Sequence, residues 1–340
     1  MEESAVQESL PLTPALSPEG RGGACATPKI SGTGLVDPAP KTSQSATSQS
    51  ASHPLPGFLD VPADFASFEG ARVLILPVPY EQTTTYLKGT SGGPAAVLRA
   101  STQVEFYDEV LGTEPFRAGI HTLPPLDATG PPEAVINRIA ERVASLPADR
   151  LVVILGGEHT VALGALKAHR QRHPDLGLLV LDAHDDLREE YAGSRLNHAC
   201  ISRRASELVP VVQVGVRSVC GERPTKPPAM VRTFLAHQIH RTGMPTEAII
   251  KGLPASVYLS VDADVFDPAY CPGVGTPEPG GLDWYQVTDL IAAVAARRRI
   301  VGFDVVEVRP LPDQVASEFL AARLAYRAIG LILKAQGWTP

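Results

Sequence analysis

The sequence predicts an α/β protein in which a mostly parallel β-sheet is covered by helices on both faces. Two observations support this fold class. Short runs of aliphatic and β-branched residues alternate along the chain with amphipathic segments, and the runs are apolar at almost every position. Strands that are apolar throughout are typical of parallel sheets buried between two helical layers. In such sheets ligands bind beyond the carboxyl ends of the strands, so we expect functional residues there.

The expected elements follow one another in a regular order from about residue 57 onward. Apolar residues recur every three or four positions in the segments at 131–146, 161–173 and 284–298, which predicts helices there. The expected strands are the apolar runs at 71–79, 150–157, 176–184, 209–218, 256–264 and 300–310.

Residues 1–56 differ from the rest of the chain because they are rich in Ser, Thr, Pro, Gly and Ala and lack apolar periodicity. Such a segment cannot bury enough apolar surface to offset the entropy lost on ordering. We therefore predict a disordered low-complexity tail at 1–56 and a single folded domain at 57–340.

Charge and cysteine content exclude several classes of protein. The formal net charge of −7 argues against a nucleic-acid partner, which would require a basic face. We expect no membrane partner, because no apolar run is long enough to span a bilayer, and no secretory signal follows the acidic start MEES. Cysteines occur without a C-x-x-C pair, at Cys25, Cys200, Cys220 and Cys271. This pattern is typical of free thiols in a reducing compartment, so a cytoplasmic location is expected.

Polar residues gather where the expected strands end. In LVLDAHDDLRE (179–189), Asp182, His184 and Asp186 share one side if the extended conformation continues, and Asp185 faces away. Asp262 and Asp264 repeat this spacing at the end of another strand.

His159 follows a third strand, at 150–157, so four aspartates and two histidines are expected at one edge of the sheet. Singly, such residues are commonly turn, cap or hydrogen-bonded polar residues. Together, the carboxylates would repel one another unless cations are present. Two divalent cations bridged by shared carboxylates remove this repulsion, and the donor types suit Mn²⁺, with Zn²⁺, Ni²⁺ and Co²⁺ also compatible.

These motifs resemble those of the ureohydrolase family of arginases and agmatinases. They stand as GGEH at 156–159, DAHDD at 182–186 and SVDADVFDP at 260–268, within a resemblance that covers roughly residues 70–335. The agmatinase branch matches best, through GVGTPEPGGL at 273–282 and GFDVVEVRP at 302–310. The resemblance implies an arginase-like, three-layer αβα sandwich with a central, mostly parallel eight-stranded sheet, and a homo-oligomer of three or six subunits.

The resemblance also implies residue roles within the catalytic domain at 57–340. Glu307 would bind the substrate guanidinium, and His198 would carry protons. Without the resemblance, Glu307 could instead pair with Arg309, and His198 could be a solvent-exposed loop histidine. Two divalent cations per subunit, with Mn²⁺ expected, would be held by His159, Asp182, His184, Asp186, Asp262 and Asp264, among which Asp182 and Asp262 would bridge both ions.

The expected reaction is hydrolysis of a small cationic guanidino compound to urea and an amine, with agmatine giving putrescine as the leading case. Guanidinobutyrate, guanidinopropionate and arginine are alternative substrates, and Arg188 is the candidate cation for a substrate carboxylate. A non-catalytic metal-binding homologue and a zinc deacetylase of related fold are further alternatives. The chain departs from the family pattern at Glu158, Asn197 and Cys271, where relatives have Asp, Ser and Ala. The change at Glu158 lies outside the ligand set, whereas the other two are expected near the substrate pocket and leave the substrate open.

Overall fold

A computed structural model describes residues 55–221 and 228–339. The predicted tail at 1–56 therefore lies outside the described residues, except for its last two positions. Across the described ranges, no helix combines the length and the apolar character needed to cross a membrane.

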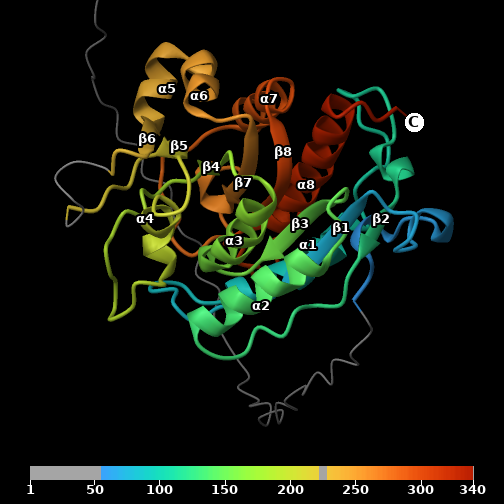
Figure 1. Ribbon diagram of the computed structural model, residues 1–340, viewed down its shortest axis with the longest axis horizontal. Coiled ribbons are helices and arrows are strands. Elements are labelled where there is room, and N and C mark those ends of the chain that lie inside the picture. Colours follow the sequence, from blue (N-terminus) through green and yellow to red (C-terminus); the bar gives the residue numbers. More distant parts are fainter. Residues whose placement is uncertain (1–54, 222–227, 340) are drawn as a thin grey trace, which may run out of the picture. The chain divides into compact units, whose positions relative to one another are not determined.

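Within the described residues, eight strands form one parallel sheet in the order β2-β1-β3-β8-β7-β4-β5-β6 (Figure 1). The predicted strands are confirmed as β1 (Val73–Val78), β3 (Leu151–Gly156), β4 (Leu176–Leu181), β5 (Val211–Val216), β7 (Ser256–Asp262) and β8 (Arg299–Val306). The apolar-run criterion missed both edge strands, β2 (Ile120–Thr122) and β6 (Val231–Leu235). β2 has only three residues and β6 is largely not buried, so neither carries a long apolar run.

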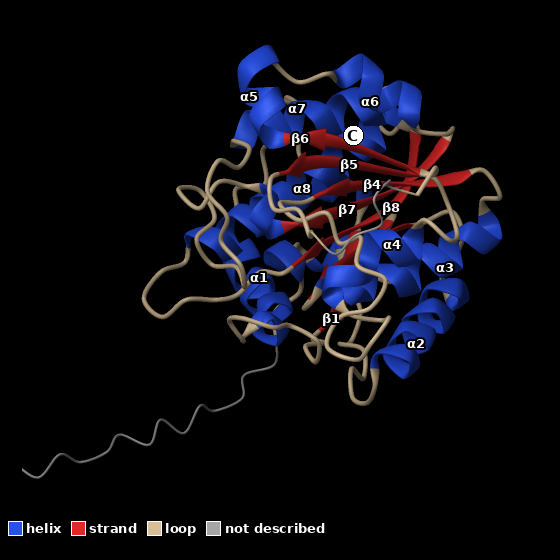
Figure 2. Ribbon diagram, turned by 90° about the vertical axis from the view of Figure 1, so that its left-hand side faces the viewer, coloured by secondary structure: helices blue, strands red, loops and turns tan. Residues whose placement is uncertain are grey.

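Helices cover both faces of the sheet, as Figure 2 shows. One layer contains α2 (Pro132–Ser145), α3 (Ala162–Arg172) and α4 (Ile201–Ala205), of which α2 and α3 match predicted segments. The other contains α1 (Gly93–Ser101), α5 (Ala236–Thr242), α6 (Thr246–Gly252), α7 (Trp284–Ala295) and α8 (Ala316–Ala335). The helix predicted at 284–298 corresponds to α7, which begins with a capping box between Asp283 and Gln286.

The hydrophobic core is divided in two by the sheet because successive side chains of a strand point to opposite faces. In β1, Val73 and Ile75 pack in the core beneath α1, α7 and α8, whereas Leu74 and Leu76 pack in the core beneath α2 and α3. Every residue of β1 is buried. This burial on both faces confirms the predicted three-layer α/β fold.

The order of the strands brings the candidate functional residues together. β3, β8, β7 and β4 are neighbours at the centre of the sheet. β3 and β8 are adjacent even though they are far apart in the sequence, since β3 ends at Gly156 and β8 ends at Val306. Since all of them are parallel, their carboxyl ends lie at the same edge. The residues that follow these strands are therefore adjacent in space.

Candidate active site

The first group of candidate metal ligands is centred on His159, which follows β3. Its Nδ1 atom lies 3.2 Å from Asp182 Oδ2, 3.2 Å from Asp262 Oδ2 and 3.6 Å from Asp186 Oδ2. These side chains come from three different strand ends, as predicted. The ring of His159 is 1% exposed, so this group is shielded from solvent.

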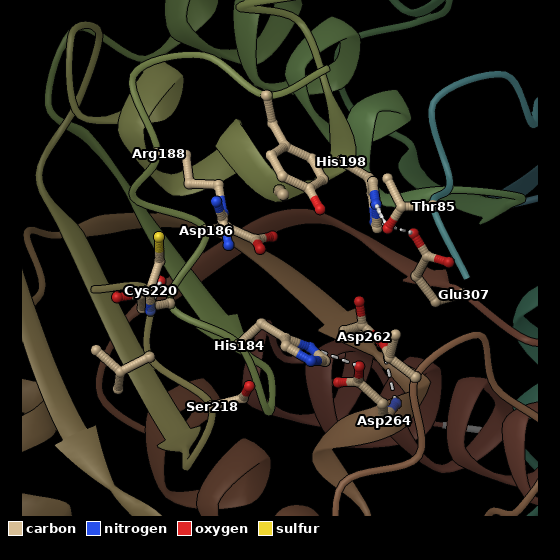
Figure 3. A pocket seen from close by; sticks show the side chains of 15 residues that line it. Thr85, His184, Asp186, Arg188, His198, Ser218, Cys220, Asp262, Asp264 and Glu307 are labelled. Carbon is tan, nitrogen blue, oxygen red and sulfur yellow. Dashed lines mark hydrogen bonds and ion pairs between the residues drawn. The ribbon is translucent and has the colours of Figure 1, made fainter. Parts of the chain in front are cut away.

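The second group is centred on His184. Its Nδ1 atom lies 2.9 Å from Asp264 Oδ2 and 3.6 Å from Asp182 Oδ1. Figure 3 shows His184 and Asp264 facing each other on the floor of the pocket. In the described part of the chain, the two groups that could hold a metal ion share Asp182.

The local backbone differs from the extended conformation on which the predicted spacing rested. β4 ends at Leu181, and Asp186 adopts a left-handed conformation with φ of 45°. Asp264 lies in a 3₁₀ turn, where its N–H donates to Asp262 Oδ1 at 2.9 Å. The predicted residues do converge, but turns rather than strand alternation orient the last of them. Asp185 belongs to neither ligand group although it lines the same pocket, and its Oδ1 accepts from the Cys220 N–H at 3.4 Å.

The charges of this cluster suit divalent cations. Burial, followed by the charges of Asp264 and Asp182, raises the pKa of Asp262 well above its usual range. Burial and then the charge of Asp182 raise the pKa of Asp186 in the same way. Among the described residues, His159 Nδ1 and Asp182 Oδ2 are buried without a hydrogen-bond partner. Buried nitrogen and oxygen atoms that face one another in this way match the donor set of a transition-metal site.

A polar relay behind the site fixes the ring of His159. Its Nε2 atom lies 3.0 Å from Ser260 Oγ, and the Ser260 hydroxyl donates to Asp304 Oδ1 at 2.6 Å. Burial raises the pKa of Asp304 to about 6. A histidine that donates through Nε2 presents the lone pair of Nδ1, here to the carboxylates of the first group. This relay was not predicted from the sequence, although Ser260 and Asp304 are polar residues within mostly apolar strands.

Arg217 forms hydrogen bonds to two loops beside the second group of candidate metal ligands. Its guanidinium donates to the backbone carbonyls of Asp264 at 2.6 Å, Phe266 at 3.2 Å and Glu278 at 2.9 Å. Burial lowers its pKa, although nearby acidic residues, first among them Asp264, oppose the shift. Several acceptors aimed at one planar guanidinium hold the turn that contains Asp264 in place.

Glu307 contacts the backbone of His159 and has a left-handed backbone conformation with φ of 62°. Its Oε1 atom accepts a hydrogen bond from the His159 N–H at 2.8 Å and lies 3.7 Å from His198 Nδ1. Arg309 instead donates to the Lys88 carbonyl, so the structure does not support the alternative Glu307–Arg309 ion pair. Left-handed backbone in a non-glycine residue is strained and commonly occurs at functional sites.

His198 is partly buried rather than solvent-exposed, since its side chain is 17% exposed. Burial opposes protonation of the ring, but the carboxylate of Glu307, 3.7 Å away, raises its pKa above the usual value. In Figure 3, the ring lies beside Thr85 and Glu307 at the pocket wall. His198 and Glu307 are thus brought together as the resemblance implies.

A cavity of about 170 Å³ is lined by several of the predicted site residues, namely His184, Asp186, His198, Asp262, Asp264 and Glu307. Its wall includes Thr276 and Arg188, of which Arg188 was named from the sequence, and the Arg188 guanidinium lies 4.3 Å from the centre of the Tyr191 ring. Glu278 Oε1 lies 4.0 Å from His184 Nε2. Cys271 is buried, and burial raises its thiol pKa to about 12.

Comparison with known proteins gives concordant matches. The family model described as "Arginase family" matches residues 71–330. The N(1)-aminopropylagmatine ureohydrolase of Thermus thermophilus is 41% identical over 277 residues, which cover 80% of this chain and 94% of that protein. The N(1)-aminopropylagmatine ureohydrolase of Synechocystis is 38% identical over 279 residues, covering 78% and 90%. Among solved structures, the agmatine ureohydrolase of Thermoplasma volcanium gives a TM-score of 0.75 at 31% identity, covering 84% of this chain and 97% of that chain.

Proposed function

Because the chain belongs to the arginase family, we propose that it hydrolyses the guanidino group of N(1)-aminopropylagmatine to release urea and spermidine. Membership confirms the family resemblance of the motifs. The observation that supports this substrate is that two relatives, 38% and 41% identical to this chain, are named N(1)-aminopropylagmatine ureohydrolases. Agmatine, the substrate expected from the sequence, is the second candidate, because a structurally similar protein is an agmatine ureohydrolase.

The six candidate ligands are proposed to hold two divalent cations, with Mn²⁺ as the expected metal. They are His159, Asp182, His184, Asp186, Asp262 and Asp264. When bound, two cations that share a water lower the pKa of that water and supply a strong nucleophile at neutral pH. Asp182 is the bridging carboxylate best supported by the geometry, because it belongs to both groups.

Glu307 is proposed to bind and orient the guanidinium. A guanidinium presents paired N–H donors, which a carboxylate accepts in a charge-assisted, directional arrangement. The His159 N–H holds Glu307 Oε1, so the carboxylate keeps one orientation at the pocket wall. The guanidino carbon would then face the water held between the candidate metal ligands.

His198 is proposed to deliver the proton that the leaving nitrogen needs. The bond between the guanidino carbon and the chain nitrogen breaks, and the oxygen of water becomes the carbonyl oxygen of urea. The chain nitrogen leaves as an amine after gaining a proton. Imidazole titrates in the range required for this transfer, and His198 lies next to the residue proposed to bind the guanidinium.

The charge of the pocket agrees with a substrate that carries several positive charges. Its lining includes five acidic residues and one arginine, and Glu278, which is not part of that lining, lies beside the second ligand group with 39% of its side chain exposed. N(1)-aminopropylagmatine has two amino groups beyond its guanidinium, whereas agmatine has one. We propose that Glu278 faces one of these ammonium groups, so Glu278→Gln should reduce kcat/KM more for the longer substrate.

The experiment that tests the proposal is urea release from Mn²⁺-loaded protein with N(1)-aminopropylagmatine, agmatine, arginine and guanidinobutyrate. A parallel preparation of Glu307→Gln controls for contaminating enzymes. The highest kcat/KM is expected for N(1)-aminopropylagmatine. A higher value for agmatine would replace the first candidate by the second, and preference for arginine or guanidinobutyrate would contradict both. Failure to release urea from any of them would contradict the function. An oligomer of three or six subunits and a cytoplasmic location remain predictions.

A further inference from the structure

Two departures from the family motifs, Glu158 and Asn197, meet at a single residue of the loop after β1. Both contact Thr83, although the two are far apart in the sequence. We propose that Thr83 is a positioning residue for His198, held by Glu158 on one side and aimed at the His198 backbone on the other. This inference rests on the proposed function because it assumes that His198 transfers a proton.

The Glu158 carboxylate anchors the loop. It is fully buried and accepts hydrogen bonds from the N–H groups of Gln82 and Thr83, both at 2.6 Å. It also accepts from the hydroxyls of Thr83 at 2.7 Å and Thr160 at 2.5 Å. A buried carboxylate with this many donors is both satisfied and rigid. Because Glu158 directly precedes His159, the loop is fixed to the same backbone as a candidate metal ligand.

The Thr83 hydroxyl forms one hydrogen bond to Glu158 and one to His198, and its donor and acceptor roles in these two bonds are fixed. A hydroxyl has a single proton to donate, and here it donates to Glu158 Oε1. Its lone pairs are therefore left to accept, and the His198 N–H donates to Thr83 Oγ1 at 2.9 Å. The carboxylate thus determines which way the hydroxyl points, and the hydroxyl determines where the backbone of His198 lies.

Further contacts restrain His198 on both sides. Asn197 Nδ2 lies 3.4 Å from the Thr83 carbonyl, while Asn197 Oδ1 accepts from the Ala199 N–H at 3.0 Å. These bonds cap the short 3₁₀ helix His198–Cys200 against the loop. The ring of His198 then lies between Thr85, 3.4 Å from Nε2, and Glu307, 3.7 Å from Nδ1. A small displacement of the backbone would move the ring relative to Glu307.

The test compares Thr83→Val, which keeps the shape and removes the hydroxyl, with Thr83→Ser, which restores it. We expect Thr83→Val to lower kcat about tenfold, since one hydrogen bond at a positioning residue is lost, with KM changed by no more than about twofold. Thr83→Ser should recover most of the rate. Thr84→Val is the matched control, because Thr84 lies in the same loop and bonds to Glu81 and Lys88 rather than to His198.

A double-mutant cycle separates positioning from general stabilisation of the fold. In a His198→Ala background, Thr83→Val should have no further effect on kcat, because no imidazole remains to be positioned although the backbone N–H of residue 198 is still present. An equal loss in both backgrounds, or no loss in the wild-type background, overturns the inference. Metal content and thermal unfolding are measured for each variant. If Thr83→Val does not fold, Glu158→Gln takes its place, and the same dependence on His198 is required.

Failure of this inference can be distinguished from failure of the proposed function. Wild-type protein that releases no urea from any guanidino compound contradicts the function itself. Wild-type protein that is active and unaffected by Thr83→Val contradicts only the role of Thr83.

Discussion

The backbone N–H of His159 donates a hydrogen bond to Glu307 Oε1 at 2.8 Å, which joins a candidate metal ligand to the candidate substrate-binding carboxylate. The two residues are 148 positions apart in the sequence. They meet because β3 and β8 are paired in the sheet and both residues follow the carboxyl ends of these strands. Any shift of one strand end would therefore alter both the candidate metal site and the orientation of the substrate.

Glu307→Gln should separate substrate binding from metal binding. The amide keeps the size of the side chain but loses the charge that pairs with a guanidinium, so kcat/KM should fall about 100-fold. The metal content should be unchanged because Glu307 is in neither ligand group. Urea release and elemental analysis measure the two effects. Activity within about threefold of wild type would contradict the role of Glu307.

The sharing of Asp182 by both groups predicts unequal effects of two aspartate substitutions. Asp182→Ala should abolish binding of both ions, whereas Asp264→Ala should leave one ion bound in the group around His159. Bound metal per subunit, measured after dialysis, distinguishes the two results. Retention of two ions by Asp182→Ala would show that this residue does not bridge.

Chelation of the metal from the wild-type protein should also lower its melting temperature, because the native carboxylates lose their counter-ions.

The relay behind His159 predicts an effect on metal affinity without loss of a ligand. Ser260→Ala or Asp304→Asn should weaken metal binding about 10–100-fold, because the Nε2 atom of His159 loses the partner that fixes its tautomer. Titration with a competing chelator measures the affinity. Ser256→Ala is the matched control in the same strand, since Ser256 bonds to Asp175. Equal affinities for all variants would exclude the relay.

A buried histidine far from the pocket predicts a pH-dependent contribution to stability. Burial, then the charges of His173 and Arg172, lowers the pKa of His169 from 6.5 to about 3. Below pH 6.5 His169 is protonated in the unfolded chain but stays neutral in the native state. The free energy of unfolding therefore falls as the pH decreases toward 3. From pH 7 to pH 5 the loss from this residue is about 2 kcal/mol.

His169→Gln should remove that part of the pH dependence. Denaturant unfolding of both proteins in the presence of a chelator, at pH 7 and pH 5, gives the difference free of metal effects. The wild type should lose more stability than the variant over this interval. An equal loss of unfolding free energy in the two proteins would show that His169 has the same pKa in the native state and in the unfolded chain.

Much of the candidate site could be predicted because parallel strands place their carboxyl ends at one edge of the sheet. The short motifs around Asp182 and Asp262, together with His159, therefore identified side chains that the structure brings within a few ångströms. The ends of the strands could be located from the sequence alone. Their close approach depends on the strand order, in which β3, β8, β7 and β4 are neighbours, and this order could not be read from the sequence.

What could not be predicted depends on contacts between distant segments. Ser260 reaches Asp304 only because β7 and β8 pair in the register that sets these residues opposite each other. Thr83 contacts Glu158 because the loop after β1 folds over the end of β3. The left-handed backbone of Asp186 is imposed by its surroundings, since an aspartate has no strong preference for that conformation.

The position of β8 also determines when the enzyme can mature during synthesis. β8 is the last strand to be made, yet it lies between β3 and β7. Until it emerges, the chain can form only two partial sheets, one carrying His159 and the other carrying the aspartates, and each has an apolar edge open to other chains. No nascent chain that ends before about residue 306 can therefore assemble the complete site, because β8 and Glu307 are not yet present.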